Sequence, residues 1–157
     1  MKPIFAAAFA MLVATSASAD SLMINAKDIK WGDAPPVLPK GAKIAALNGD
    51  PSKSGPFTIR LMMPANYKIA PHWHTKDENL TVISGTLGLG LDDKMGGMVH
   101  ELKAGGYHYL PGKTNHYAIA KGQTVVQVSG DGPFDITYLN PADDPSKMAK
   151  KDGMMKK

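Results

Sequence analysis

The chain has 157 residues, of which 43% are hydrophobic and 20% are charged; it has a formal net charge of +4 and no cysteine. This length leaves room for one domain with one core, and the lack of cysteine excludes a disulfide scaffold and thiol chemistry. The positive charge does not indicate a nucleic-acid partner, because the lysines that create it lie near the two ends of the chain: Lys2, Lys147, Lys150, Lys151, Lys156 and Lys157. Between these ends the basic and acidic residues nearly balance, so no nucleic acid is expected as a partner.

Residues 1–19 have the pattern of a cleaved signal peptide. Lys2 precedes an apolar run over residues 3–14, and a small-x-small cleavage sequence follows at 17–19. The apolar run is too short to cross about 30 Å of hydrocarbon, so no stable membrane insertion is expected after cleavage. The mature chain is therefore expected to begin at Asp20 and to be exported, either to the periplasm or out of the cell.

Residues 20–56 are expected to form a loop-rich N-terminal arm and the first strands. Pro35, Pro36 and Pro39 fall close together in this segment, which favours irregular backbone over a long strand. The arm is expected to wrap around the domain that follows it.

Residues 57–140 are expected to form that domain, a β-barrel. Turn signals rich in glycine, proline and asparagine recur at short intervals here, and no window has a sustained helical period. The segments between the turns are short and rich in β-favouring residues: FTIRLMM, NLTVISGTLGLGL, YHYLP, HYAIA, QTVVQVSG and FDITYL. Many short strands at this spacing predict an all-β sandwich or barrel.

The segment PHWHTKDENLTVISG, residues 71–85, carries a candidate metal site. Side chains alternate faces along a strand, so His72 and His74 are expected to point to the same side. Residues 75–77 are polar and can turn the chain, and Glu78 would then begin the next antiparallel strand beside the histidines. Two imidazoles and a carboxylate that converge suit a divalent metal ion. Because an HxH pair on an exposed strand is also common, this segment alone leaves a metal site and a plain surface both open.

A second segment, AGGYHYLPGKTNHYAIA at residues 104–120, strengthens the interpretation. Together the two segments resemble the paired motifs of the cupin superfamily. The first motif is matched in type and spacing by the two histidines, the glutamate and a glycine, and the second by a glycine, a proline and a histidine: His72, His74, Glu78 and Gly85, then Gly105, Pro111 and His116. The resemblance implies a cupin-type double-stranded β-barrel, or jelly roll. It also implies one divalent transition metal held by His72, His74, Glu78 and His116.

Three positions depart from the cupin motifs. Asn66 stands where the first motif begins with glycine, and asparagine tolerates left-handed backbone angles. Lys113 replaces a glycine of the second motif, and the neighbouring Gly112 is expected to supply the flexibility there. Ala120 replaces the final asparagine. None of these residues is a metal ligand, so the departures concern turn geometry.

The ligand set does not identify the metal. Three imidazoles and one carboxylate suit Mn, Fe, Co, Ni, Cu or Zn, and four protein ligands leave up to two positions open in an octahedral site. An exported chain collects its metal outside the cytoplasm, where copper and zinc compete by affinity, which weighs against iron.

His108, in the segment YHYLP, is the candidate catalytic residue outside the ligand set. It is predicted either to transfer protons in the pocket or to be a partly buried, hydrogen-bonded histidine. Trp73 lies between the ligand histidines and is expected to face away from them.

Two functions stay open at this point. The first is a metal-dependent, dioxygenase-like enzyme that acts on a small organic molecule, and the open metal positions favour it. The second is a non-catalytic periplasmic protein that binds a metal or a ligand, or that serves in stress response; it is favoured by the lack of an obvious general base and by Arg60 being the single arginine. A small-molecule ligand or substrate is the expected partner, with a homodimer as an open alternative to a monomer. Residues 141–157 are expected to form a basic, disordered tail.

Overall fold

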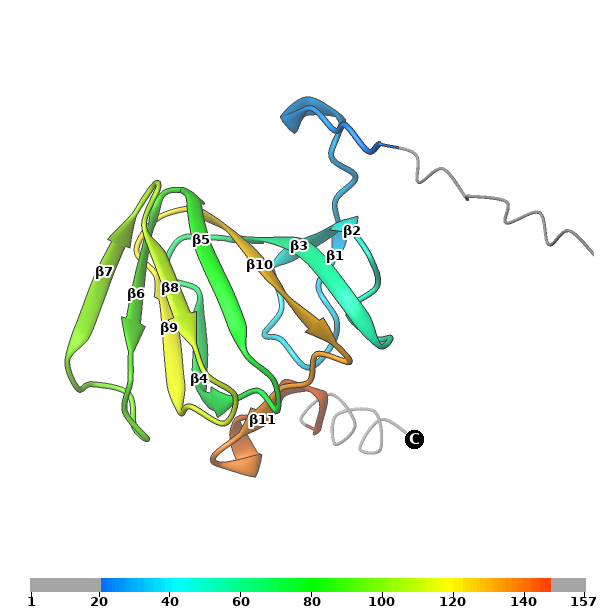
Figure 1. Cartoon of the computed structure of the whole chain (residues 1–157). Helices are drawn as coiled ribbons and strands as arrows, with labels where there is room; N and C mark the ends of the chain where they lie inside the picture. Colours follow the sequence, from blue (N-terminus) through cyan, green and yellow to red (C-terminus); the bar gives the residue numbers. More distant parts are fainter. Residues whose placement is uncertain (1–20, 148–157) are drawn as a thin grey trace, which may run out of the picture.

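The computed structural model describes residues 21–147, which form two antiparallel β-sheets that pack face to face (Figure 1). The β3 sheet contains, in spatial order, β1 (Gly32–Asp33), β2 (Lys43–Asn48), β3 (Gly55–Met63), β10 (Thr124–Gly132), β5 (Glu78–Ser84) and β8 (Tyr107–Leu110). The β4 sheet contains β11 (Thr137–Tyr138), β4 (Lys68–Trp73), β9 (His116–Ala120), β6 (Thr86–Gly90) and β7 (Val99–Lys103). This architecture confirms the predicted all-β jelly roll with a loop-rich N-terminal arm.

Helical structure within residues 21–147 consists of two short 3-10 turns, η1 (Ala26–Asp28) and η2 (Pro141–Asp143), and of residues 145–147, which are α-helical. None of the helical segments in the described residues is long and apolar enough to cross a bilayer. The domain is therefore held together by its sheets and by the side chains between them.

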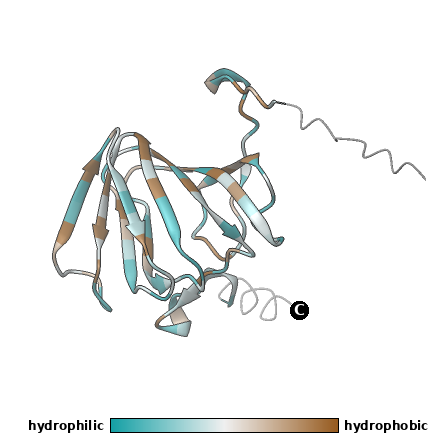
Figure 2. Ribbon diagram, viewed as in Figure 1, coloured by the Kyte–Doolittle hydropathy of each residue, from teal (hydrophilic) through white to brown (hydrophobic). Residues whose placement is uncertain are grey.

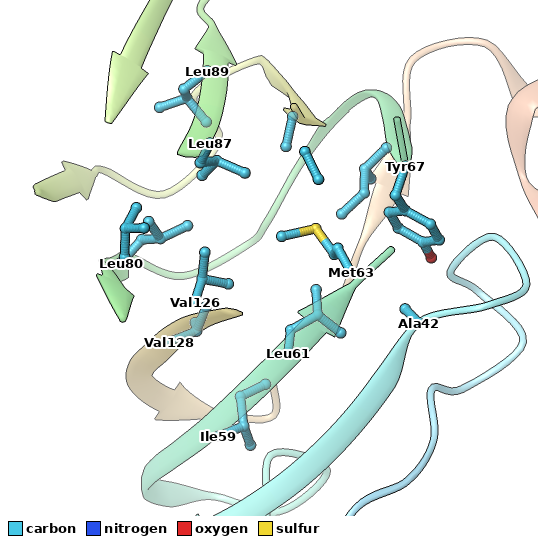
Figure 3. Close-up of a cluster of buried hydrophobic side chains, with 14 of the residues drawn as sticks. Ala42, Ile59, Leu61, Met63, Tyr67, Leu80, Leu87, Leu89, Val126 and Val128 are labelled. Carbon is cyan, nitrogen blue, oxygen red and sulfur yellow. The ribbon is translucent and has the colours of Figure 1, made fainter. Parts of the chain in front are cut away.

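The alternation of side chains along the strands creates the core. On β3, Phe57, Ile59, Leu61 and Met63 are buried, while the residues between them are only partly covered. Hydrophobic and hydrophilic residues accordingly alternate along many strands (Figure 2). Side chains from β3, β5, β6 and β10 converge in the space between the two sheets (Figure 3). Burial of this apolar surface is the main favourable term in folding of such a domain.

Two of the three departures from the cupin motifs coincide with left-handed backbone. Asn66 has a φ of 62°, as its tolerance for this region predicted, and Lys113 has a φ of 64°. The expectation that Gly112 would supply the flexibility beside Lys113 is wrong. Gly112 is required for close approach instead, because a Cβ there would lie 2.6 Å from the carbonyl oxygen of Thr75. Lys113 keeps its unusual angle while its amide donates to the carbonyl of His74 over 2.7 Å.

The N-terminal arm crosses the domain and is fastened to it by two buried tyrosines. Residues 34–39, called the strap below, follow β1. The Tyr138 hydroxyl donates to the carbonyl of Val37 over 2.7 Å, and the Tyr67 hydroxyl donates to the carbonyl of Pro39. These bonds fix the backbone of the strap in place.

The predicted division of the chain is only partly visible in the described residues. The predicted signal peptide and residues 148–157 of the predicted tail lie outside them. Inside them, β1 and β2 of the arm join the same sheet as β3, so the arm and the barrel share one sheet.

Candidate metal centre

The sheets bring all four predicted ligands to one place. His72 lies on β4, His74 directly follows that strand, Glu78 begins β5 and His116 begins β9. His72 and His116 are paired across neighbouring strands, so their rings lie side by side with centroids 4.1 Å apart. All four residues are at least 92% buried. The cluster therefore joins both sheets at one end of the space between them.

The donor atoms of these side chains are close together. One ring nitrogen from each of His72, His74 and His116 lies within 4.8 Å of the others. The Glu78 Oε2 atom lies 3.6 Å from His116 Nε2 and 3.8 Å from His74 Nε2. Donors of one metal ion lie about 3–3.5 Å apart when metal–ligand bonds are about 2.0–2.2 Å long. The two measured distances from Glu78 to the histidine nitrogens are thus within a few tenths of an ångström of that separation.

Each histidine is oriented by a main-chain carbonyl. The Nδ1 atoms of His72, His74 and His116 lie 2.7, 2.5 and 2.9 Å from the carbonyl oxygens of Ala70, Asp135 and Thr114. Because a carbonyl only accepts, each Nδ1 carries the proton and each Nε2 presents a lone pair. This is the hydrogen-bonding pattern by which proteins fix metal-binding histidines.

The environment makes the imidazoles neutral. Burial lowers the pKa of His72 well below its usual value, and the neighbouring His116 and His74 lower it further. Burial lowers the pKa of His116 to about 4 and shifts the pKa of His74 in the same direction. At neutral pH no proton has to leave these rings before they bind a metal.

Glu78 responds to the same environment in the opposite direction. Burial raises the pKa of its carboxyl to about 7. With neutral imidazoles around it, its contacts with His74 and His116 are close approaches and not ion pairs. A divalent cation would supply the positive charge that a buried carboxylate needs. The donor chemistry, the orientation of the rings and the burial all fit a transition metal ion.

A cavity of about 150 Å³ opens beside these four residues. Apart from them its walls are almost entirely hydrocarbon, contributed by both sheets and by the strap. Near the cluster, Phe134 stacks on the His74 ring with centroids 4.2 Å apart and an interplanar angle of 20°. A ligand in this cavity would touch the metal-binding residues at one end and apolar side chains elsewhere.

The structure places His108 away from this cavity. It lies on β8 opposite Leu80 of β5, and it is not among those of residues 21–147 that line the cavity. Its Nε2 atom is buried, and no hydrogen-bond partner for it occurs in the described part of the chain. Burial, followed by the nearby His100, lowers its pKa. A role for His108 in proton transfer stays a prediction.

Several cavity residues were not singled out from the sequence. Phe134, Asp135 and Ile136 belong to the loop between β10 and β11, and Val37 and Leu38 belong to the strap. They reach the site through contacts over long sequence separations, such as the 61 residues between His74 and Asp135. No local spacing signals such contacts.

The fold and the buried three-histidine cluster define a cupin with a metal-site-like centre. A polyketide cyclase, RemF from Streptomyces resistomycificus, is 19% identical, with a TM-score of 0.68 over 83% of this chain and 93% of its own. A candidate acetylacetone dioxygenase from Methylibium petroleiphilum PM1 is 20% identical, with a TM-score of 0.62 over 83% and 88%. An RmlC-like cupin from Shewanella frigidimarina NCIMB 400 is 13% identical, with a TM-score of 0.56 over 72% of this chain and 91% of its own. This likeness establishes the cupin fold.

Within the cupins, the chain belongs to the family described as domain of unknown function DUF4437, whose model matches residues 14–137. No curated protein sequence matches the chain significantly.

Proposed function

We propose that this protein is an exported, metal-dependent cupin enzyme, oxygenase-like in its chemistry, that acts on a small organic molecule. The observation that carries the proposal is the meeting of four buried donor residues with a cavity of about 150 Å³. A structural metal site would need no such space beside it. A catalytic one needs room for a ligand that reaches the metal.

The chain's own residues have distinct parts in this proposal. His72, His74, Glu78 and His116 would hold the ion, and a bound ion would supply Lewis acidity and open coordination positions. The carbonyls of Ala70, Thr114 and Asp135 hold the imidazole rings in the binding orientation. The hydrocarbon walls exclude water, which strengthens electrostatic interactions inside the site.

The structural neighbours add fold-level support. RemF is a polyketide cyclase and the Methylibium protein is a candidate dioxygenase, so similar barrels are associated with chemistry on small organic molecules. At 19–20% identity this support is an analogy of fold, and the site residues carry the proposal.

One observation favours the alternative of a non-catalytic protein that binds a metal or ligand. Among the residues of the described chain that line the cavity, Asp135 is the titratable residue beyond the four candidate ligands. Its carboxylate accepts hydrogen bonds from the Thr75 amide and hydroxyl over 2.8 and 2.7 Å. A free general base is thus not evident in the cavity.

The test begins with the metal content of the protein purified from its native compartment. The wild type is then loaded in turn with each of the six candidate metals and screened for oxygen uptake and product formation with small carbonyl compounds and catechols. The control is His116→Ala, which should remain a folded β protein by circular dichroism but lose tight metal binding and turnover. A metal without exchangeable water in relaxation measurements would end the enzyme proposal. An open metal without turnover would favour the binding protein.

Export is a separate part of the proposal. It is supported by the leader pattern of residues 1–19 and is tested by the intact mass of the protein after expression in a bacterium with a periplasm. The mass should correspond to a start at Asp20. A mature protein that keeps the leader would contradict export.

A further inference from the structure

The walls of the cavity carry information about the ligand that the metal-binding residues do not. Leu61 and Met63 of β3, Leu80 of β5, Leu87 of β6 and Val126 of β10 all line it, and each is at least 93% buried. Among residues 21–147, polar lining beyond the four candidate ligands is confined to Asp135, whose side chain is exposed and accepts hydrogen bonds from Thr75. Polar atoms are therefore gathered at one end of the cavity.

No lysine or arginine is among the residues of the described chain that line the cavity. Arg60 lies on β3 between the inward-facing Ile59 and Leu61, and its Nε donates to the Gln127 side chain over 3.1 Å on the other face of the sheet. A carboxylate or phosphate that is not on the metal would thus be buried without a partner. Burial of an unpaired ion costs several kcal/mol, and an unpaired hydroxyl also carries a penalty.

The size of the cavity limits the ligand further. An apolar protein cavity of about 150 Å³ holds a molecule of the size of benzene. The strap closes one side, with Pro35, Val37 and Leu38 in the lining. The Tyr138 hydroxyl holds the backbone of the strap at Val37, so the strap limits the length of a ligand on that side of the cavity. The ligand is therefore expected to have about six to eight non-hydrogen atoms.

We propose that the site selects small, uncharged, largely apolar molecules with two neighbouring oxygen atoms at one end, such as β-diketones or catechols, and that it rejects dicarboxylates, phosphates and sugars. The inference rests on the proposed function, because the oxygen end is assigned to a metal held by the four candidate ligands. The apolar walls of the cavity determine that the rest of the ligand is uncharged and largely apolar.

A matched pair of probes tests this selection by binding alone, without turnover. Pentane-2,4-dione and malonate both have about seven non-hydrogen atoms and two oxygens in the same 1,3 relation, but malonate adds charged oxygens where the dione has methyl groups. Their affinities are measured at neutral pH by calorimetry on protein loaded with Ni(II), after metal analysis confirms loading. The same pair on Ni(II) held by a small three-imidazole chelator in water gives the preference of the metal itself.

We expect the protein to prefer the dione by about 100-fold or more relative to that reference, because the two malonate oxygens that are not on the metal would carry negative charge against apolar walls without a partner. If malonate binds as tightly as the dione or more tightly, relative to the small chelator, the proposed selection is wrong, but the metal site is not contradicted. A wild type that retains no metal would overturn the proposed function and the inference together.

A pair of variants sharpens the test. Ile136 lines the cavity and is partly exposed, so a lysine in its place can keep contact with water and still reach a ligand. Ile136→Lys should reduce the preference for the dione at least about tenfold by pairing with malonate, whereas Ile136→Met, without the charge, should keep the wild-type preference. An unchanged preference in a folded Ile136→Lys protein would show that the walls do not set the selection; if that variant fails to fold, the wild-type comparison alone decides.

Discussion

Asp77 and Glu78 are neighbours in the chain, yet the fold gives their carboxyl groups opposite properties. Asp77 is exposed, and hydrogen bonds from the Tyr109 hydroxyl and the Gly112 amide, 2.7 and 2.8 Å long, lower its pKa. Glu78 is 6% exposed, and burial raises its pKa to about 7. One carboxylate is stabilised by donors at the surface, and the other is held without a counter-charge inside.

The contrast follows from the period of two in a β-strand. Glu78 begins β5 with its side chain between the sheets, and the residue before it must point outward. A shift of one residue in register would therefore exchange the two carboxyl groups. The face on which a residue lies, more than its place in the sequence, decides which acid can bind a metal.

The largest expected difference between Asp77 and Glu78 is in metal affinity when each carboxylate is removed in turn. Glu78→Gln replaces one of the four donors by a weaker neutral one and should reduce metal affinity on the order of 1,000-fold, well beyond the about 10- to 100-fold typical of substitutions that only orient a ligand. Asp77→Asn should leave the affinity nearly unchanged. Competition with a chromophoric chelator measures both. Equal losses would contradict the assignment of Glu78 as a ligand.

The second difference concerns the stability of the metal-free protein. The pKa of Glu78 is about 7 in the folded state against an ordinary 4.5, so between these pH values the folded state binds more protons than the unfolded chain. Its contribution to stability is present below about pH 4.5 and is lost as pH rises through 7. Relative to Glu78→Gln, the wild type should lose about 3 kcal/mol of unfolding free energy between about pH 4.5 and pH 8. Urea denaturation in the presence of a chelator measures this.

Asp77→Asn should change stability with the opposite dependence on pH. The folded-state pKa of Asp77 is lowered, so its stabilising contribution is present above the ordinary pKa and is lost in acid. The unfolding free energies of Asp77→Asn and Glu78→Gln should therefore diverge as pH rises. Parallel dependence on pH in the two variants would contradict the opposite pKa shifts of Asp77 and Glu78.

The third difference is the pH dependence of metal binding. Because protonated Glu78 must lose its proton to bind, affinity should rise about tenfold per pH unit below about 7 and level off above it. The imidazoles should add little to this slope at pH 6 to 7, since burial lowers the pKa of each of them. Calorimetry in buffers of different ionisation enthalpy should detect about one released proton per metal near pH 6. Glu78→Gln should abolish this slope, and release of three protons would indicate charged histidines instead.

The smallest expected effect is a change in the pKa of Asp77, the exposed carboxyl group of the two. Tyr109→Phe removes the hydrogen bond that most lowers the pKa of Asp77. That pKa should rise toward its ordinary value while the pKa of Glu78 stays unchanged. Titration of both carboxyl carbons by NMR measures this, and a parallel shift of Glu78 would show that the two faces are coupled.

The sequence predicts local features of this fold well. The period of two and the turn residues give the β-sheet architecture, and the spacing of His72, His74, Glu78 and His116 gives the residues that the sheets bring together. The tolerance of asparagine for left-handed angles correctly predicts the turn at Asn66. Each of these conclusions depends on residues close in the chain or on a motif with fixed spacing.

The parts that could not be predicted depend on distant contacts. The hydrogen bond from Tyr138 to the strap spans 101 residues, and the stacking of Phe134 on His74 joins a late loop to the residue that follows β4. Likewise, Gly112 packs closely against Thr75 of another turn, and the left-handed angle falls on Lys113 instead. Such packing becomes visible only when both partners are placed in three dimensions.

The hydrogen bonds that orient the three histidines have a consequence for how this barrel can change over generations. The acceptors are main-chain carbonyls at positions 70, 114 and 135, which every amino acid possesses. A point mutation at those positions keeps the acceptor, provided that the backbone stays in place. Mutations at these three positions therefore leave the orientation of the metal-binding histidines unchanged. Mutations in the apolar walls can then change which ligand the cavity binds while the metal-binding residues keep their geometry.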